Sequence, residues 1–151
     1  MAITDLSDLP GSGALIGIDP GSKTLGIAAS DSLRLIANPV ETIQRGKKLA
    51  PALTRLWEIV DNRSAVGLVI GLPLNMDGSS GPRVQSTRAL ANNILASRDI
   101  PIAFFDERLT SAQAERGMLD ADLSRARRAE LIDASAAAVI LQTALDRLAN
   151  A

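Results

Sequence analysis

The stretch Ile16–Ser30, IGIDPGSKTLGIAAS, joins two short apolar runs through a Pro-Gly-Ser-Lys turn. Runs of this length between turn residues are typical of strands that are covered on both faces, so the stretch predicts a hairpin inside a sheet. The first run ends in a carboxylate, Asp19. Because a charge is costly to bury, three interpretations stand: Asp19 is a turn former, the turn after it holds a phosphate, or Asp19 is one member of a metal site completed further along the chain.

The rest of the chain predicts an α/β fold. A third strand lies within Leu33–Ile43, and Pro39 indicates that this strand is bulged or at an edge. Helical and strand patterns then alternate, with helices expected at 46–63, 83–98 and 128–148 and strands at 65–70 and 100–105. We therefore expect a five-stranded mixed sheet in which three antiparallel strands are followed by two strands added by helical crossovers, with helices on both faces.

The length of 151 residues fits one domain, and 46% hydrophobic residues fit a folded chain. We expect residues 1–13 to form a flexible N-terminal extension and residues 14–151 to form the single domain. The sequence shows neither a signal peptide nor a long apolar run, so a cytoplasmic protein with no membrane partner is expected.

The composition also excludes several kinds of chemistry. The chain has no cysteine and no histidine, which removes thiol and imidazole nucleophiles, the usual zinc sites and every Ser-His-Asp arrangement. Acid and base catalysis would have to come from carboxylates, lysines or metal-bound water. A net charge of −1 argues against coating nucleic acid by bulk charge, although basic residues can still cluster locally.

Carboxylates occur at three positions that the predicted fold brings to one edge. Asp19 ends the first strand, Asp106 and Glu107 follow the fifth, and Asp133 lies among Leu, Ile and Ala in the last helix. Three such groups repel one another unless cations hold them, and oxygen ligands suit Mg²⁺ or Mn²⁺. Two such ions can hold both the attacking water and the leaving oxygen of a phosphodiester.

Simpler explanations stand beside the metal site. Asp19 precedes Pro-Gly and could serve only the turn, and Asp133 could pair with Arg127 or Arg128. Strand alternation sends Asp106 and Glu107 to opposite faces, so one of the two at most is a direct ligand.

Four segments resemble the signature blocks of the YqgF-type family in order and spacing. They are GIDPGSKTLGIAASD at 17–31, VIGLPLNMDGSSGPR at 69–83, FFDERLTSAQAE at 104–115 and RRAELIDASAAAVILQ at 127–142. The resemblance implies an RNase H-like fold and a nuclease. Members of the family are described as pre-16S ribosomal RNA nucleases or as Holliday junction resolvases.

The resemblance also implies which residues form the site. Asp19, Glu107 and Asp133 would be the catalytic carboxylates and the ligands of two Mg²⁺ or Mn²⁺ ions, with Asp106 as an alternative ligand. The family often has a basic residue where this chain has Thr24. The basic residues expected to contact nucleic acid are Lys23, Arg83, Arg108, Arg127 and Arg128.

These features predict a hydrolase acting on ester bonds, a metal-dependent nuclease that processes the 5′ end of pre-16S ribosomal RNA in ribosome biogenesis. Its partners would be the precursor RNA and ribosomal precursor particles, or branched DNA, and it would act as a monomer or a homodimer. The alternatives are a Holliday junction resolvase in DNA recombination and repair, and a non-catalytic nucleic-acid-binding module. An actin-like ATPase ranks last, because 151 residues leave no room for a second lobe.

Overall fold

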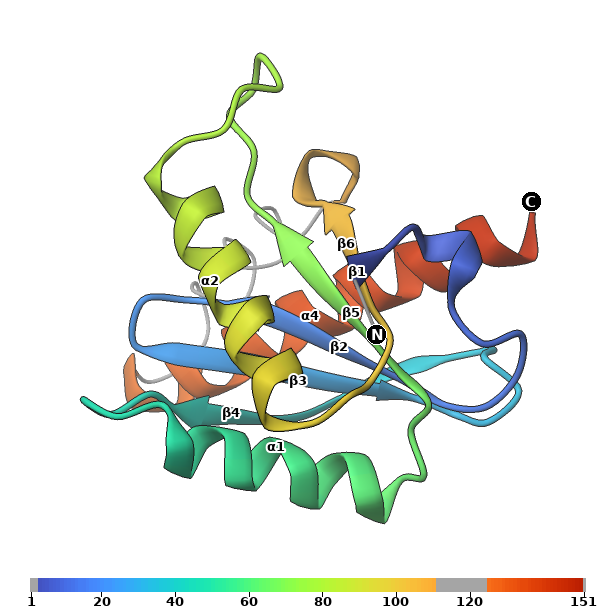
Figure 1. Cartoon of the computed structure of the whole chain (residues 1–151), viewed down its shortest axis with the longest axis horizontal. Helices are drawn as coiled ribbons and strands as arrows, with labels where there is room; N and C mark the ends of the chain where they lie inside the picture. The colour runs from blue at the N-terminus through green and yellow to red at the C-terminus, as the bar shows by residue number, and fades with distance from the viewer. Residues whose placement is uncertain (1–2, 111–124, 151) are drawn as a thin grey trace.

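The structure, a computed structural model, describes residues 3–110 and 125–150, and over residues 125–132 it describes the course of the helix alone. One six-stranded sheet has the order β1-β6-β5-β2-β3-β4 (Figure 1). Its strands are β1 Ile3–Thr4, β2 Leu15–Pro20, β3 Thr24–Ser30, β4 Ala37–Gln44, β5 Gly67–Leu72 and β6 Ile102–Asp106. The helices are α1 Ala50–Asn62, α2 Pro82–Ser97 and α4 Arg125–Ala149, with short 3-10 helices η1 Leu6–Asp8 and η2 Glu107–Leu109.

The sheet has the predicted mixture of strand directions. Strands β2, β3 and β4 are antiparallel neighbours, whereas β5 runs parallel to β2, and β6 runs parallel to β5. The pairing of β3 with β4 shifts register between Ile27, opposite Glu41, and Ala28, opposite Pro39. Val40 is therefore an extra residue on β4, which confirms the bulge expected from Pro39.

A sixth strand was not predicted. β1 pairs in parallel with β6, with Ile3 opposite Ile102, and it comes from residues that the sequence placed in an N-terminal extension. A two-residue strand has no alternation that could reveal it, and its partner lies far along the chain. After η1, Leu9 is buried in the same hydrophobic cluster as Leu15. The described part of this segment therefore belongs to the packed fold.

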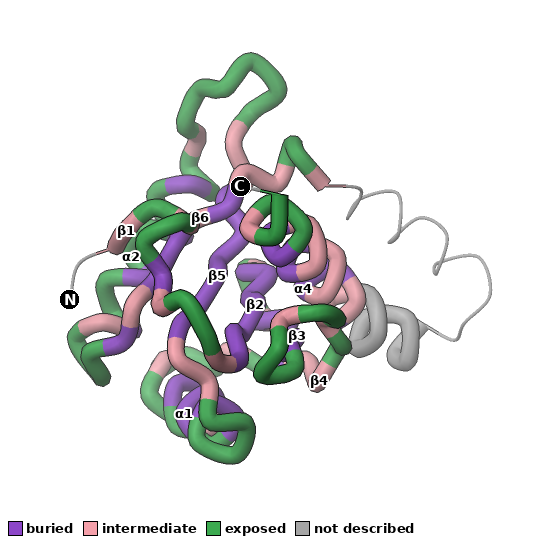
Figure 2. Tube along the Cα trace, turned by 90° about the vertical axis from the view of Figure 1, so that its right-hand side faces the viewer, coloured by how far each residue is buried: buried purple, intermediate pink, exposed green. Residues whose placement is uncertain are grey.

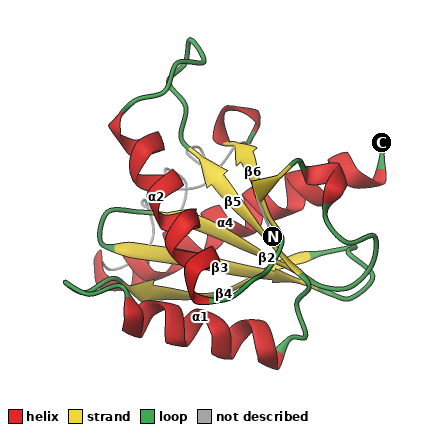
Figure 3. Ribbon diagram, in the orientation of Figure 1, coloured by secondary structure: helices red, strands yellow, loops and turns green. Residues whose placement is uncertain are grey.

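Helices cover both faces of the sheet, as expected. Helices α1 and α2 lie on one face and α4 lies on the other (Figures 1 and 3). Residues of β2 alternate between two hydrophobic clusters, with Ile16 and Ile18 on the α1 and α2 side and Leu15 on the α4 side. The central strands are buried along their length (Figure 2). None of the described helices has the length and apolar composition needed to cross a membrane.

Helix α4 packs unusually close to the sheet because small residues meet at the contact. A Cβ added to Gly17 would lie 2.8 Å from Cβ of Leu141, and one added to Gly26 would lie 2.0 Å from the carbonyl oxygen of Asp133. The facing side of α4 contains several buried alanines, namely Ala134, Ala136, Ala137 and Ala144. The backbone of α4 is therefore brought close to the edge of the sheet where Asp19 lies.

Candidate functional site

Asp19 occupies the next-to-last position of β2 and is 4% exposed. Side chains of a strand alternate between its faces, so Asp19 shares the α4 face with Leu15 and Gly17. The strand ends in Pro20, and the turn to β3 follows. A buried carboxylate at the carboxyl end of a central strand fits a functional group better than a surface turn former.

Two glycines flank Asp19 on the neighbouring strands. Gly26 of β3 is its register partner, and Gly71 of β5 follows Ile70, which pairs with Ile18. Adjacent strands lie about 4.8 Å apart. The neighbouring positions on β3 and β5 are therefore both glycines, so neither position places a side chain next to the Asp19 carboxylate.

The space above each glycine is filled by a segment that carries another predicted acid. A Cβ on Gly71 would lie 2.8 Å from Oε1 of Glu107, and a Cβ on Gly26 would lie 2.0 Å from the carbonyl oxygen of Asp133. Oδ1 of Asp19 and Oε1 of Glu107 are both shielded from solvent. The fold thus places Glu107 on one side of Asp19 and Asp133 on the other.

The carboxylate of Asp133 is held toward the sheet by β3. The hydroxyl of Thr24 donates a hydrogen bond of 2.7 Å to Oδ2 of Asp133. Thr24 is the first residue of β3 and Asp133 lies on α4, so the bond joins strand and helix at the edge where Asp19 lies.

Asp106 has a different environment from Glu107. In β6, Asp106 shares the parity of Ile102 and Phe104, whose side chains belong to the α1 and α2 side. It caps η2 by accepting the backbone N–H of Arg108 at 2.9 Å, and its Oδ2 lies 2.6 Å from Nη2 of Arg108. The hydrogen bonds from the Arg108 side chain hold the pKa of Asp106 below its ordinary value. Of the two adjacent acids, Glu107 is the one beside Gly71.

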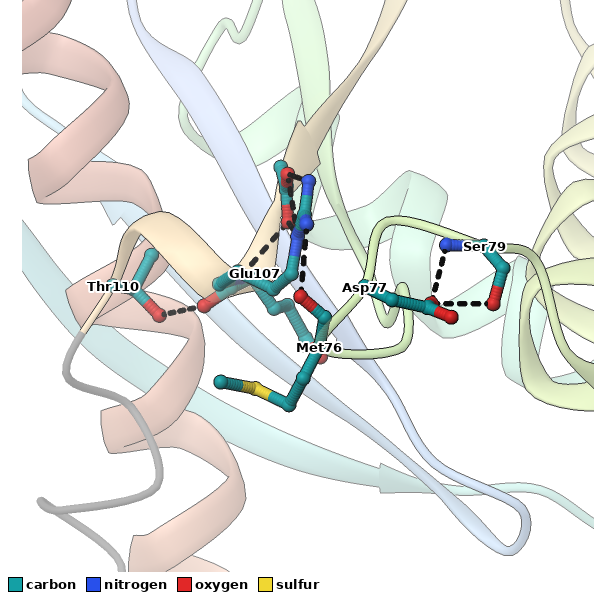
Figure 4. A network of polar contacts seen from close by, with 7 residues as sticks. Met76, Asp77, Ser79, Glu107 and Thr110 are labelled. Atoms are coloured by element: carbon teal, nitrogen blue, oxygen red, sulfur yellow. Dashed lines mark hydrogen bonds and ion pairs between the residues drawn. The ribbon is translucent and has the colours of Figure 1, made fainter.

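Arg108 also fastens the loop that follows β5. Its Nη1 donates to the carbonyl oxygen of Met76 at 3.3 Å, while Asp77 accepts hydrogen bonds from the backbone N–H and the hydroxyl of Ser79 (Figure 4). These bonds connect the Met76–Ser79 turn to the end of β6. Met76 itself is 89% exposed at this turn. The Arg108 side chain, expected to contact nucleic acid, is thus used in an internal network.

The other predicted basic residues divide into two groups. Lys23, on the turn between β2 and β3, and Arg83, in the first turn of α2, are both exposed near the end of β2. Arg127 and Arg128 lie in the first turn of α4, and their side chains fall outside the described residues.

The donors at this edge are suited to a hard divalent cation, because carboxylate oxygens are the ligands that Mg²⁺ and Mn²⁺ prefer. Within residues 3–110 and 133–150, no group of three acidic side chains is gathered closely enough to hold a metal ion. The segments that carry Glu107 and Asp133 nevertheless flank Asp19 at this edge, one over Gly71 and the other over Gly26.

Sequence reasoning did not identify Thr24, Gly26 and Gly71 as parts of the site. The glycines carried a usable signal, since a glycine inside a strand marks close approach of another backbone or a ligand. Thr24 carried none, because its partner lies 109 positions away in the chain.

Comparison with known proteins identifies the family of the chain. The RuvX family, described as "Holliday junction resolvase", matches residues 13–147. A protein of Rhodobacter capsulatus named "Putative pre-16S rRNA nuclease" is 57% identical over 142 residues, which is 94% of this chain and 89% of that protein. A Bradyrhizobium protein of the same name is 56% identical over 141 residues, covering 93% and 87% of the two chains.

Two solved structures share the fold. Thermus thermophilus RuvC, in complex with a Holliday junction substrate, has a TM-score of 0.55 at 15% identity and covers 89% of this chain and 94% of its own. The yeast mitochondrial Holliday junction resolvase Ydc2 has a TM-score of 0.51 at 13% identity, covering 95% and 83%. These likenesses confirm the predicted RNase H-like fold. The match over residues 13–147 and the two bacterial relatives show that the chain belongs to the RuvX family, the YqgF-type family whose blocks it resembles.

Proposed function

We propose that this protein is a metal-dependent nuclease that hydrolyses phosphodiester bonds at the edge formed by Asp19, Glu107 and Asp133. The observation that carries the proposal is the placement of Asp19 between two side-chain-free positions, with Glu107 over Gly71 and Asp133 over Gly26. Carboxylate oxygens suit a hard divalent cation, so the convergence of these segments around Asp19 supports a cation site.

Asp19, Glu107 and Asp133 are the residues that would hold Mg²⁺ or Mn²⁺, and we propose two ions. Such ions supply charge stabilisation at phosphorus and lower the pKa of water that they bind. The chain's own contribution is to fix the ligands: β2 positions Asp19, η2 positions Glu107, and the Thr24 hydroxyl orients Asp133. Asp106 is left to cap η2 and to pair with Arg108.

Exposed cations near the acids would contact the substrate backbone. Lys23 and Arg83 lie near the end of β2, on the turn and on α2 respectively. Phosphate contacts of this kind position a strand without reading its sequence. We propose the same role for Arg127 and Arg128, which precede Asp133 on α4.

The proposed substrate is the 5′ end of pre-16S ribosomal RNA. The support comes from relatives that carry this name at 54–57% identity over most of their length, such as those of Rhodobacter capsulatus and Cereibacter sphaeroides. The protein would then act in the cytoplasm, alone or as a homodimer, on ribosomal precursor particles. The second candidate, cleavage of a four-way DNA junction, is favoured by the description of the RuvX family.

The decisive experiment compares two substrates under the same conditions, a 5′-extended precursor of 16S ribosomal RNA and a synthetic four-way DNA junction. Each is incubated with Mg²⁺ or Mn²⁺ and with a chelator, using the wild type and Asp19→Asn. Metal-dependent cutting of the RNA alone supports ribosomal RNA processing, whereas paired symmetric cuts in the junction support the resolvase. Binding of either substrate without any cutting would favour a non-catalytic binding module.

A second readout tests the cation site without relying on activity. A cation that binds the folded state alone raises the thermal unfolding midpoint by mass action. We expect Mn²⁺ to raise the midpoint of the wild type and to have little effect on Asp19→Asn. Equal shifts in the two proteins would contradict the proposed ligand role of Asp19.

A further inference from the structure

A small cavity of about 70 Å³ lies at the end of β2, beside the acidic edge. The turn residues Pro20 and Gly21 form one wall. Arg45, which follows β4, and Arg83, in the first turn of α2, line it from two further segments. Three segments that are distant in sequence therefore meet around one cavity.

The lining of this cavity is positively charged and rich in hydrogen-bond donors. Arg45 and Arg83 are among the residues that line it, together with Ser22 and Ser86, and none of its described lining residues carries a carboxylate. Within residues 3–110 and 133–150, the ion pairs of arginine involve Arg55, Arg98 and Arg108, and neither arginine of the cavity. Nη1 of Arg45 donates to the carbonyl oxygen of Gly21 at 2.5 Å, which holds this guanidinium against the turn.

These features select a type of ligand. Guanidinium groups match the oxygens of phosphate with paired hydrogen bonds, and serine hydroxyls add further donors. The volume of about 70 Å³ is enough for a small group of several atoms. It accommodates one compact anionic group. A phosphate group fits both the size and the charge.

The position of the cavity relates it to the acids. Pro20 lines the cavity and directly follows Asp19, whose side chain lies on the α4 face. Arg83 belongs to α2, which covers the opposite face. A strand that crosses the end of β2 would thus present one phosphate to Asp19 and a neighbouring phosphate to Arg83.

We propose that the cavity between Arg45 and Arg83 binds a backbone phosphate of the nucleic-acid strand, next to the phosphate that is cleaved. This subsite rests on the proposed nuclease function. It holds the strand in register, so that the bond beside the bound phosphate lies over Asp19. It also uses chemistry that RNA and DNA share, and therefore does not choose between them.

The first test measures binding of the precursor RNA and of the four-way junction at several salt concentrations, in the Asp19→Asn background so that the strand stays intact. Arg83→Ala is the informative variant, because the Arg83 side chain is exposed and lies at the cavity. Arg63→Ala is the matched control, since Arg63 is an exposed arginine at the end of α1, before β5 begins, and so at the opposite edge of the sheet.

We expect Arg83→Ala to weaken binding about tenfold, the size of one hydrogen-bonded charge contact. The slope of log affinity against log salt should fall by about 0.7 for a single strand or 0.9 for duplex DNA, corresponding to one lost phosphate contact. Arg83→Lys should keep most of the slope because it keeps the charge. Arg63→Ala should have the affinity and the salt dependence of the parent protein.

The second test removes the charge from the substrate. A single methylphosphonate linkage is placed at each position around the cleaved bond. At a position next to that bond it should weaken binding of the parent protein and have little effect on Arg83→Ala, because the variant has already lost the contact.

If a methylphosphonate weakened binding equally in the parent protein and in Arg83→Ala at every position, the subsite would be overturned and the nuclease proposal would stand. Failure of the wild type to bind or cut either substrate would overturn both.

Discussion

The hydroxyl of Thr24 donates a hydrogen bond to the Asp133 carboxylate at 2.7 Å, across 109 positions of the chain. Thr24 starts β3, directly after the turn that follows Asp19 and β2. The bond therefore links two of the three proposed ligands through one short hairpin. Partners of this kind orient metal-binding carboxylates and tune their affinity.

Removing this hydroxyl should weaken the cation site. Thr24→Val keeps the shape of the side chain, so we expect the fold to persist while cation affinity and cleavage fall about 10- to 100-fold. Thr24→Ser keeps a hydroxyl and should retain most of both. Titration with Mn²⁺, followed by thermal unfolding and by cleavage, measures the two effects. Wild-type cation affinity in Thr24→Val would show that the bond is structural only.

The two adjacent acids should differ sharply when each is neutralised. Glu107→Gln should lower the cleavage rate by more than about 100-fold, because Glu107 lies beside Asp19 over Gly71. Changes to residues that only support a metal ligand cost up to about that factor. Asp106→Asn should lose less activity, since Asp106 pairs with Arg108 and caps η2. Single-turnover cleavage with saturating metal measures both variants. A greater loss in Asp106→Asn would reverse the assignment.

The contact between α4 and the sheet should not tolerate a methyl group at Gly26. A Cβ there would lie 2.0 Å from the Asp133 carbonyl oxygen, so the helix must move. We expect Gly26→Ala to lower the free energy of unfolding by more than about 3 kcal/mol, beyond the usual cost of overpacking. Gly46→Ala is the control, because the nearest atom to its added Cβ lies at 3.9 Å. Chemical denaturation of the two variants gives the comparison, and similar values would contradict the close packing.

Acid should weaken the turn between β3 and β4 through Asp31. The backbone N–H groups of Ile36 and Leu35 donate to its Oδ1, and the bond from Ile36 is the main cause of a pKa below the ordinary value. A depressed pKa in the folded state means that the stabilisation is present above the unfolded pKa of about 3.9 and is lost as the pH falls through the folded value.

The measurement is the unfolding midpoint of the wild type and of Asp31→Asn between pH 7 and pH 2.5. The wild type should be more stable at neutral pH, and the difference should disappear below the folded pKa of Asp31. A difference that stays constant over this range would contradict a contribution from the charged form.

Much of the fold could be predicted from local patterns. The hairpin of β2 and β3 follows from two apolar runs around a Pro-Gly turn, and the alternation of helices and strands after β4 follows from the change of hydrophobic period. The bulge opposite Ala28 was predictable because Pro39 lacks the N–H that a regular ladder needs. These features depend on residues that are neighbours in sequence.

The parts that escaped prediction depend on contacts between distant segments. Strand β1 has two residues and exists because β6 offers an open edge to Ile3 and Thr4. The resemblance named Glu107 with Asp106 as the alternative, but strand alternation left the choice open, and a physical reason for Glu107 needed the position of Gly71 beside it. The hydrophobic pattern could predict that several acids lie at the carboxyl ends of the strands. It could not predict which of their carboxylates lies beside Asp19.

The order in which the ribosome makes the chain has a consequence for the proposed site. Its three carboxylates come from β2, from η2 and from α4, which is the last of the described helices. A nascent polypeptide that has emerged only as far as β6 carries Asp19 but lacks Asp133 and the helix that covers the sheet. The ability to cut nucleic acid would therefore arise only after α4 has left the ribosome.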